Sequence, residues 1–167
     1  MKIFVTCRRF MKITLLTVGK NTDKDIQPLI NRYTDRLSHY VRFEIRAVAD
    51  IKAPGNISTE RQKQREGETI LSIIRPSDHV ILLDEKGKEP TSRGFAEMLG
   101  NHLNRGTRDI VFIVGGPYGF SQAVYDRGDD KIALSRMTLT HEMVRLFFVE
   151  QLYRAFTILK GENYHHD

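Results

Sequence analysis

Residues Ile110–Ser121 read IVFIVGGPYGFS, and the change of character within this stretch decides the fold. The run Ile110–Val114 is entirely apolar, which is typical of a strand buried on both faces of a parallel sheet. Three glycines and a proline follow within five residues, so the backbone can turn tightly and approach a ligand closely. Ligands bind at the carboxyl ends of parallel strands. The stretch therefore predicts either a binding loop or a tight turn without a ligand, with Ser121 capping a helix.

Patterns typical of strands and helices alternate along the rest of the chain. Runs of β-favouring residues predict strands at 12–18, 43–48, 79–83, 109–114 and 131–134. Apolar residues at helical spacing predict helices at 26–40, 59–74, 92–105 and 141–160, and a short one between Ser121 and Gly128. Thr59 to Gln62 resembles a capping box, Thr91 or Ser92 caps the next helix, and 84–90 has the composition of a polar loop. This order favours a single α/β domain with a mostly parallel sheet flanked by helices.

Length and composition fit one globular domain. The chain has 167 residues, of which 40% are hydrophobic and 28% charged. Its apolar runs are about as long as strands, so we expect no segment that crosses a membrane. The single cysteine, Cys7, has no intramolecular partner, which favours a reducing, cytoplasmic location. Met11 begins a second MK sequence, so we expect Met1–Phe10 to be an upstream extension and 11–167 to be the domain.

The net charge of +5 is concentrated in the first half of the chain. Residues 1–83 carry 15 basic and 9 acidic side chains, whereas residues 84–167 carry 11 and 12. Such asymmetry is compatible with a surface that faces RNA, and equally with a solvated basic face. The candidate RNA contacts on predicted helix faces are Arg32, Arg36, Arg61, Lys63 and Arg65.

The glycine loop does not match the usual nucleotide-binding motifs. GGPYG is not followed by the Gly-Lys-Ser/Thr of a phosphate loop, and it lacks GxGxxG spacing. Cys/His clusters are absent as well, so we expect no metal site. Two further segments, 82–84 and 134–139, also follow predicted strands and would lie at the same edge of the sheet. Together the three segments could hold a flat, partly polar ligand such as an adenosine, although Leu134, Met137 and Leu139 could equally be core residues.

Five stretches carry a resemblance to a known family. They are MKITLLTVGK at 11–20, LLDEKGK at 82–88, FIVGGPYG at 112–119, ALSRMTLTHEMVR at 133–145 and EQLYRAFTILKGENYHH at 150–166. In this order and spacing they resemble the SPOUT-class ribosomal RNA large subunit methyltransferase H family. The resemblance covers nearly everything from Met11 onward.

This resemblance implies an activity and a set of site residues. The activity is methyl transfer from S-adenosylmethionine to N3 of a pseudouridine in 23S rRNA, within the large subunit or the assembled ribosome, with no DNA partner. The implied cofactor contacts are Leu83, Gly115, Gly116, Leu134, Ser135, Arg136, Met137, Thr138 and Leu139. The implied catalytic neighbours are His141, Tyr164 and His165. His141 or His165 would accept the N3 proton and Tyr164 would stack on or orient the base; His141 alone could also be a structural residue near a helix cap.

The resemblance also implies a homodimer and a trefoil-knotted carboxyl-terminal half. We expect dimerisation through the last helix, because Phe147, Phe148, Tyr153 and Phe156 are too many aromatic residues for one buried stripe. His166 stands where many relatives carry arginine, so any phosphate contact there is in doubt.

Two other functions remain open at this point. One is a non-catalytic RNA-binding or ribosome-associated factor that retains the fold, and the other is a small nucleotide-binding regulator. If the glycine loop forms part of a cofactor pocket, a side chain at Gly115 or Gly116 should block the cofactor without unfolding the domain.

Overall fold

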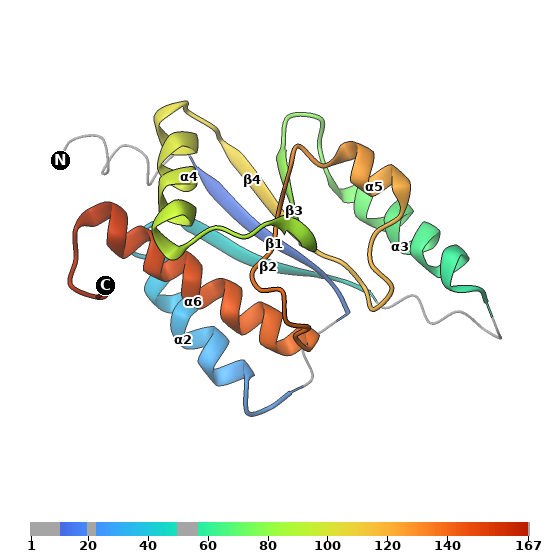
Figure 1. The fold of residues 1–167 in the computed structure, drawn as a ribbon, viewed down its shortest axis with the longest axis horizontal. Helices are drawn as coiled ribbons and strands as arrows, with labels where there is room; N and C mark the ends of the chain where they lie inside the picture. The colour runs from blue at the N-terminus through green and yellow to red at the C-terminus, as the bar shows by residue number, and fades with distance from the viewer. Residues whose placement is uncertain (1–10, 20–22, 50–56, 167) are drawn as a thin grey trace.

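The computed structural model describes residues 11–19, 23–49 and 57–166, and its centre is a five-stranded parallel sheet (Figure 1). The strands lie in the order β2-β1-β4-β3-β5, and every pair is parallel. Their bounds are Lys12–Val18 for β1, Arg42–Val48 for β2, His79–Lys88 for β3, Asp109–Val114 for β4 and Asp130–Ile132 for β5. The predicted single α/β domain is confirmed.

Helices cover both faces of the sheet (Figure 1). Three pack on one face: α2 (Gln27–Leu37), α4 (Ser92–Asn104) and α6 (His141–Lys160). The other face carries α3 (Thr59–Ile73) and α5 (Gln122–Arg127). The central strand β4 divides its side chains between the two cores: Phe112 belongs to the first and Ile113 to the second. Burial on both faces of the sheet therefore explains the unbroken apolar run of β4, as the sequence predicted.

The third strand is longer than the sequence predicts. It continues to Lys88, which pairs with Ile132 of β5 after an irregular stretch in the register that begins at Leu83. At Gly87 a Cβ atom would lie 2.5 Å from the backbone carbon of Ile132, so only glycine allows the two chains to approach there. The expected polar loop 84–90 is therefore wrong over most of its length, because backbone pairing holds these exposed polar residues extended.

The helix caps agree with the sequence in part. Thr91 caps α4 by accepting a hydrogen bond from the Gly94 amide at 3.0 Å. Of the two predicted caps, Thr91 and Ser92, the first is therefore confirmed. The cap of α3 is Ser58 and not the expected Thr59. Ser121 occupies the cap position of α5 without a capping hydrogen bond, because its hydroxyl lies against Gly67 of α3. Gly161 ends α6 in the left-handed conformation.

The expected extension Met1–Phe10, with Cys7, falls outside the part of the chain that the structure describes. Within the described ranges, no helix has both the length and the apolar character that a membrane span requires.

Candidate functional site

A pocket of about 430 Å³ lies beside the carboxyl-terminal half of β3 and the end of β4. Three segments form its walls: the end of β3, the glycine loop after β4, and the segment after β5. The lining residues are Leu83, Asp84, Glu85, Lys86, Val114 to Phe120, Tyr125, Leu134, Ser135, Met137, Thr138, Leu139 and Val144. The three segments that the sequence placed at one edge of the sheet therefore do meet around a single pocket.

Arg136 is the one expected cofactor residue that does not line the pocket. Its side chain is 87% exposed and forms an ion pair with Glu89 at 3.0 Å. The local turn accounts for this: the Ser135 hydroxyl accepts a hydrogen bond from the Met137 amide at 2.9 Å. Residues on either side of Arg136 line the pocket, whereas Arg136 projects into solvent.

The glycine loop is a tight turn closed by its own backbone. The Gly119 amide donates to the Gly116 carbonyl at 3.1 Å, and these two residues form an isolated bridge. Of the three loop glycines, Gly119 has the positive φ angle, at 81°. At Gly115 a Cβ atom would lie 3.1 Å from the Phe120 ring. Each glycine is therefore required for a different reason.

Gly116 lies against a buried carboxylate. A Cβ atom at this position would be 2.2 Å from Oε2 of Glu66, a residue of α3 that is 3% exposed and does not line the pocket. Glu66 Oε1 accepts a hydrogen bond from Gln62 at 3.0 Å, which holds the carboxylate in place. The expectation that a side chain at Gly116 would only block the pocket is therefore wrong, since it would first displace Glu66.

Replacing Gly116 with alanine is expected to destabilise the domain by about 1–3 kcal/mol, the usual cost of overpacking. The companion variant Glu66→Ala removes the clashing group, so the double variant should recover roughly 1 kcal/mol or more relative to the sum of the single changes. Urea unfolding of the four proteins measures this coupling. Strictly additive effects would show that Gly116 and Glu66 do not compete for space.

A tyrosine and an aspartate form the main polar contact in the pocket wall. The Tyr125 hydroxyl, from α5, donates a short hydrogen bond to Asp84 at the end of the regular part of β3. Burial, followed by this hydrogen bond, raises the pKa of Tyr125 to about 12, so the hydroxyl stays protonated at neutral pH. The other Asp84 oxygen accepts from the Lys86 amide at 2.7 Å. The pocket thus combines apolar walls with a fixed carboxylate.

Sequence analysis missed Tyr125. It precedes Asp126 and Arg127 in a short helix and follows the glycine loop by only a few residues. The available signal was helix phase: Val124 and Tyr125 are the apolar residues of α5, and such a helix turns them toward the sheet edge where the pocket lies.

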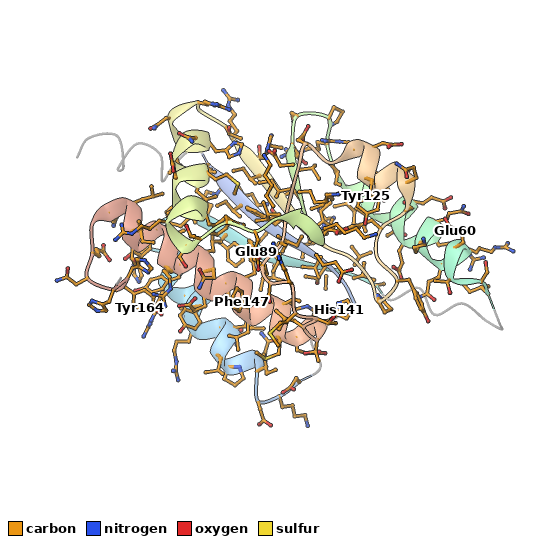
Figure 2. The ribbon with its side chains drawn as sticks, viewed as in Figure 1. Glu60, Glu89, Tyr125, His141, Phe147 and Tyr164 are labelled. Atoms are coloured by element: carbon orange, nitrogen blue, oxygen red, sulfur yellow. The ribbon has the colours of Figure 1, made fainter. Side chains whose placement is uncertain are left out.

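His141 begins α6 beside the pocket (Figure 2). Its neighbours in sequence, Leu139 and Val144, line the pocket. Thr140 caps the helix by accepting a hydrogen bond from the Met143 amide at 3.3 Å, which fixes the direction of the chain at this point. His141 is therefore placed at the rim of the pocket.

Tyr164 lies at the opposite end of α6 from His141 (Figure 2). The Tyr164 ring packs edge-on against Tyr153 with centroids 4.8 Å apart, and its hydroxyl bonds to Glu150 at 3.1 Å and Tyr33 at 3.4 Å. Burial and these hydrogen bonds raise the pKa of the Tyr164 hydroxyl, so it acts as a donor. Glu150, which the Tyr164 hydroxyl contacts, lies nine residues beyond His141, about 14 Å along the helix axis. One chain therefore does not bring the three expected catalytic residues together.

His165 is held through one ring nitrogen. Arg154 Nη1 lies 3.3 Å from His165 Nδ1, while Glu150 binds the same guanidinium at 2.6 Å. A guanidinium has only donors, so Nδ1 accepts in this contact. The tail is therefore fixed to the side of α6 through Arg154.

The aromatic residues of α6 do not form one exposed face. Phe148 and Phe156 are buried in the core, and Tyr153 packs against Tyr33 and Tyr40. Phe148 and Phe156 are therefore not available to a partner chain, whereas dimerisation through α6 stays a prediction. Phe147 is 36% exposed, and Met143, one turn earlier, is similarly exposed. The exposed apolar part of α6 is therefore a short stripe.

The candidate RNA contacts are divided between two faces of the sheet. Arg32 and Arg36 lie on α2, whereas Arg61, Lys63 and Arg65 lie on α3. Lys63 is paired with Glu60 at 2.8 Å. The guanidinium of Arg36 lies over the Tyr33 and Tyr153 rings, beside the tail that contains Tyr164. A single chain therefore does not present these five residues as one basic surface.

Comparison with known proteins identifies the family. The model that describes predicted SPOUT methyltransferases matches residues 11–165. The chain belongs to the SPOUT methyltransferases. Several relatives carry the name ribosomal RNA large subunit methyltransferase H. That of Christiangramia forsetii is 52% identical over 156 residues, which is 93% of this chain and 99% of the relative.

Two further relatives with this name give the same result. The protein of Flavobacterium psychrophilum is 53% identical over 156 residues, with 93% of this chain and 99% of the relative covered. That of Porphyromonas gingivalis is 50% identical over 157 residues, with 94% and 100% covered. The family resemblance expected from the sequence is confirmed, and the pocket at the carboxyl ends of the strands belongs to a methyltransferase fold.

Proposed function

We propose that the chain transfers a methyl group from S-adenosylmethionine to N3 of a pseudouridine in 23S rRNA. The observation that carries this proposal is the convergence of three separate segments on one pocket, at the strand ends where parallel sheets bind ligands. The names of the relatives add the large ribosomal subunit as the source of the substrate RNA. A ribosomal substrate also favours the cytoplasmic location expected from the sequence.

The pocket residues suit this cofactor. A volume of about 430 Å³ lies within the usual range for small-molecule sites, and leucine side chains and glycine backbone offer a slot for a flat ring. Asp84 and Glu85 supply negative charge for a cationic ligand. When bound, S-adenosylmethionine supplies a methyl group on a positively charged sulfur. The proposed contacts are Leu83, Gly115, Gly116, Leu134, Ser135, Met137, Thr138 and Leu139.

The remaining chemistry requires positioning of the base and removal of the N3 proton. Positioning contributes roughly 7–11 kcal/mol in favourable intramolecular models, and a matched base about 10²–10⁴-fold. His141 lies at the pocket rim and is the proposed proton acceptor. His165, held against α6 by Arg154, is the proposed RNA contact in the tail. Tyr164 offers an aromatic face or a hydroxyl donor to orient the base.

A homodimer would supply the residues that one chain keeps apart. Tyr164 and His165 contact Glu150 and Arg154 of α6 and do not line the pocket of their own chain. If two α6 helices pair side by side in opposite directions, the tail of each chain reaches the pocket of the other. The proposed active site then combines His141 of one chain with Tyr164 and His165 of the partner subunit. This pairing would also bring the basic residues of α2 near the partner's pocket.

The exposed stripe on α6 gives the first test of this dimer. Phe147→Glu is expected to convert the protein to monomers at micromolar concentration and to reduce turnover sharply, because a carboxylate would be buried in the interface. Leu29→Glu, on α2, is the matched control, since Leu29 is 37% exposed and Phe147 36%. Light scattering measures the oligomeric state of both variants, and Leu29→Glu is expected to remain dimeric. A Phe147→Glu protein that remains dimeric would place the interface elsewhere.

The trefoil knot implied by the family resemblance stays a prediction for the carboxyl-terminal half.

Labelled methyl transfer tests the proposed function. The protein is incubated with S-adenosylmethionine carrying a labelled methyl group and with ribosomes or subunits from cells that lack the modification. Label is expected in 23S rRNA. Label in 16S rRNA would contradict the proposed substrate. If RNA is bound without any transfer, the chain is a non-catalytic RNA-binding factor, and if adenine nucleotides bind without RNA, it is a nucleotide-binding regulator.

A further inference from the structure

Two histidines and an aspartate meet at the edge of the sheet opposite the pocket. His79 is the first residue of β3, Asp130 the first of β5, and His102 lies in the last turn of α4. One ring nitrogen of each histidine and one carboxylate oxygen of Asp130 all lie within 4.8 Å of one another. A cavity of about 320 Å³ adjoins them, also lined by Glu97 and Arg105. The cluster is therefore separate from the methyltransferase site.

The side chains of this cluster are held in place by other contacts. His102 is buried, and its Nδ1 lies 3.2 Å from the Thr107 hydroxyl, which orients the ring and leaves Nε2 as the second nitrogen. The two imidazole rings lie with centroids 4.4 Å apart. His79 Nε2 is 2.8 Å from Asp130 Oδ2. A hydrogen bond from a ligating histidine to a neighbouring residue is the usual outer support of a metal site.

We propose that His79, His102 and Asp130 bind a divalent transition-metal ion, with Zn²⁺ as the first candidate and water completing the coordination. Imidazole and carboxylate together suit this class of metal, and three protein ligands with an open position form a common zinc arrangement. Tetrahedral bonds of about 2.0–2.1 Å separate neighbouring ligand atoms by about 3.4 Å. The His79 and Asp130 side chains are 26% and 52% exposed, so both have room to rotate toward that spacing.

The surrounding charge favours a cation over an anion. Asp129 Oδ2 lies 3.9 Å from His79 Nδ1, and Glu97 lines the same cavity as Asp130. Arg105 is the opposing positive charge in that cavity. Asp129 is also paired with Arg127 at 3.1 Å. Three carboxylates therefore face the site against two guanidiniums, which still leaves an excess of negative charge.

The bound ion would join the end of α4 to the starts of β3 and β5. Its role is structural, because the cofactor pocket lies at the other ends of the strands. The proposal departs from the expectation of no metal site, which rested on the absence of Cys/His clusters in the sequence. These three ligands come from three different elements and meet only in the folded chain.

Titration of the full-length, metal-stripped protein with Co²⁺ and then Zn²⁺ tests the proposal. We expect one Co²⁺ per chain with visible absorption bands, displacement by Zn²⁺, and a Zn²⁺ dissociation constant of about 10 µM or below. Bound Zn²⁺ should raise the melting temperature and leave S-adenosylmethionine affinity unchanged. Failure of methyl transfer would not affect this result, so the two proposals are tested separately.

Variants identify the ligands. Asp130→Asn and His79→Gln should each weaken Zn²⁺ binding at least about tenfold, and both positions are partly exposed, so the fold should tolerate them. His39→Gln, an exposed histidine after α2, is the matched control and should bind as the wild type does. Absence of saturable binding, or binding unchanged in Asp130→Asn, would overturn the proposal. Binding lost on replacing His165 and His166 by glutamine would instead assign the metal to the tail and would equally overturn it.

Discussion

Replacing Thr138 with tryptophan is expected to abolish detectable S-adenosylmethionine binding without unfolding the domain. Thr138 lines the pocket and is exposed, so an indole there fills the space of the ligand and disturbs no packed core. We expect at least about a 100-fold loss of affinity, which corresponds to about 2.7 kcal/mol. Calorimetry measures the affinity, and circular dichroism with thermal unfolding measures the fold.

Arg136→Trp provides the matched control for this experiment. It introduces the same side chain two residues earlier, at a position that projects into solvent. Affinity for S-adenosylmethionine should remain within a few-fold of the wild type. If the two variants lose binding equally, the segment 134–139 acts as a whole and the distinction between pocket-lining and solvent-facing residues has no functional meaning. If Thr138→Trp binds normally, the pocket is not the cofactor site.

The second large effect is expected from the tail. A chain with both Tyr164→Ala and His165→Ala should bind S-adenosylmethionine as the wild type does and lose roughly 10²-fold or more in turnover. The two side chains contact Glu150 and Arg154 and do not line the pocket of their own chain, so cofactor affinity has no reason to change. Their loss removes the aromatic group proposed to orient the base and the proposed RNA contact of His165. Unaltered turnover would eliminate both residues from the mechanism.

Mixing two inactive variants shows which subunit supplies the tail. Thr138→Trp chains are combined with the Tyr164→Ala, His165→Ala chains under conditions that exchange subunits. If the tail acts on the partner's pocket, each mixed dimer contains one intact site, and about a quarter of wild-type activity should return, because half of the dimers are mixed. If the tail acts within its own chain, no site in a mixed dimer is intact and activity stays at the level of the separate variants.

Local sequence patterns predicted much of the fold. The apolar run before the glycine loop predicted a doubly buried strand, and β4 has that environment. The long amphipathic pattern beginning at His141 predicted α6 with its bounds. In contrast, the exposed polar end of β3 is extended only because Lys88 pairs with Ile132. Because these two residues are far apart in the sequence, no local pattern around either of them predicts the pairing.

The candidate site was predictable to a similar degree. Three strand-end segments predicted one pocket, because parallel strands end at a common edge. The sequence did not predict the direction of individual side chains. Arg136 projects outward because of a turn made by Ser135, and Gly116 lies against Glu66. The positions of Tyr125 and of the two clustered histidines could not be predicted, because they depend on contacts between different helices and strands. The distance of Tyr164 from His141 depends both on the length of α6 and on the return of the tail to Glu150 and Tyr153, which the sequence does not predict.

Nucleoside analysis of methylated 23S rRNA tests the central claim most directly. Ribosomes that lack the modification are treated with the protein and S-adenosylmethionine, and the digested 23S rRNA is analysed by mass spectrometry. The account predicts one new 3-methylpseudouridine per ribosome, absent when Thr138→Trp protein is used. A methyl group on uridine or on a ribose hydroxyl would contradict the account. It would also be contradicted if 23S rRNA stayed unmodified with wild-type protein that binds S-adenosylmethionine.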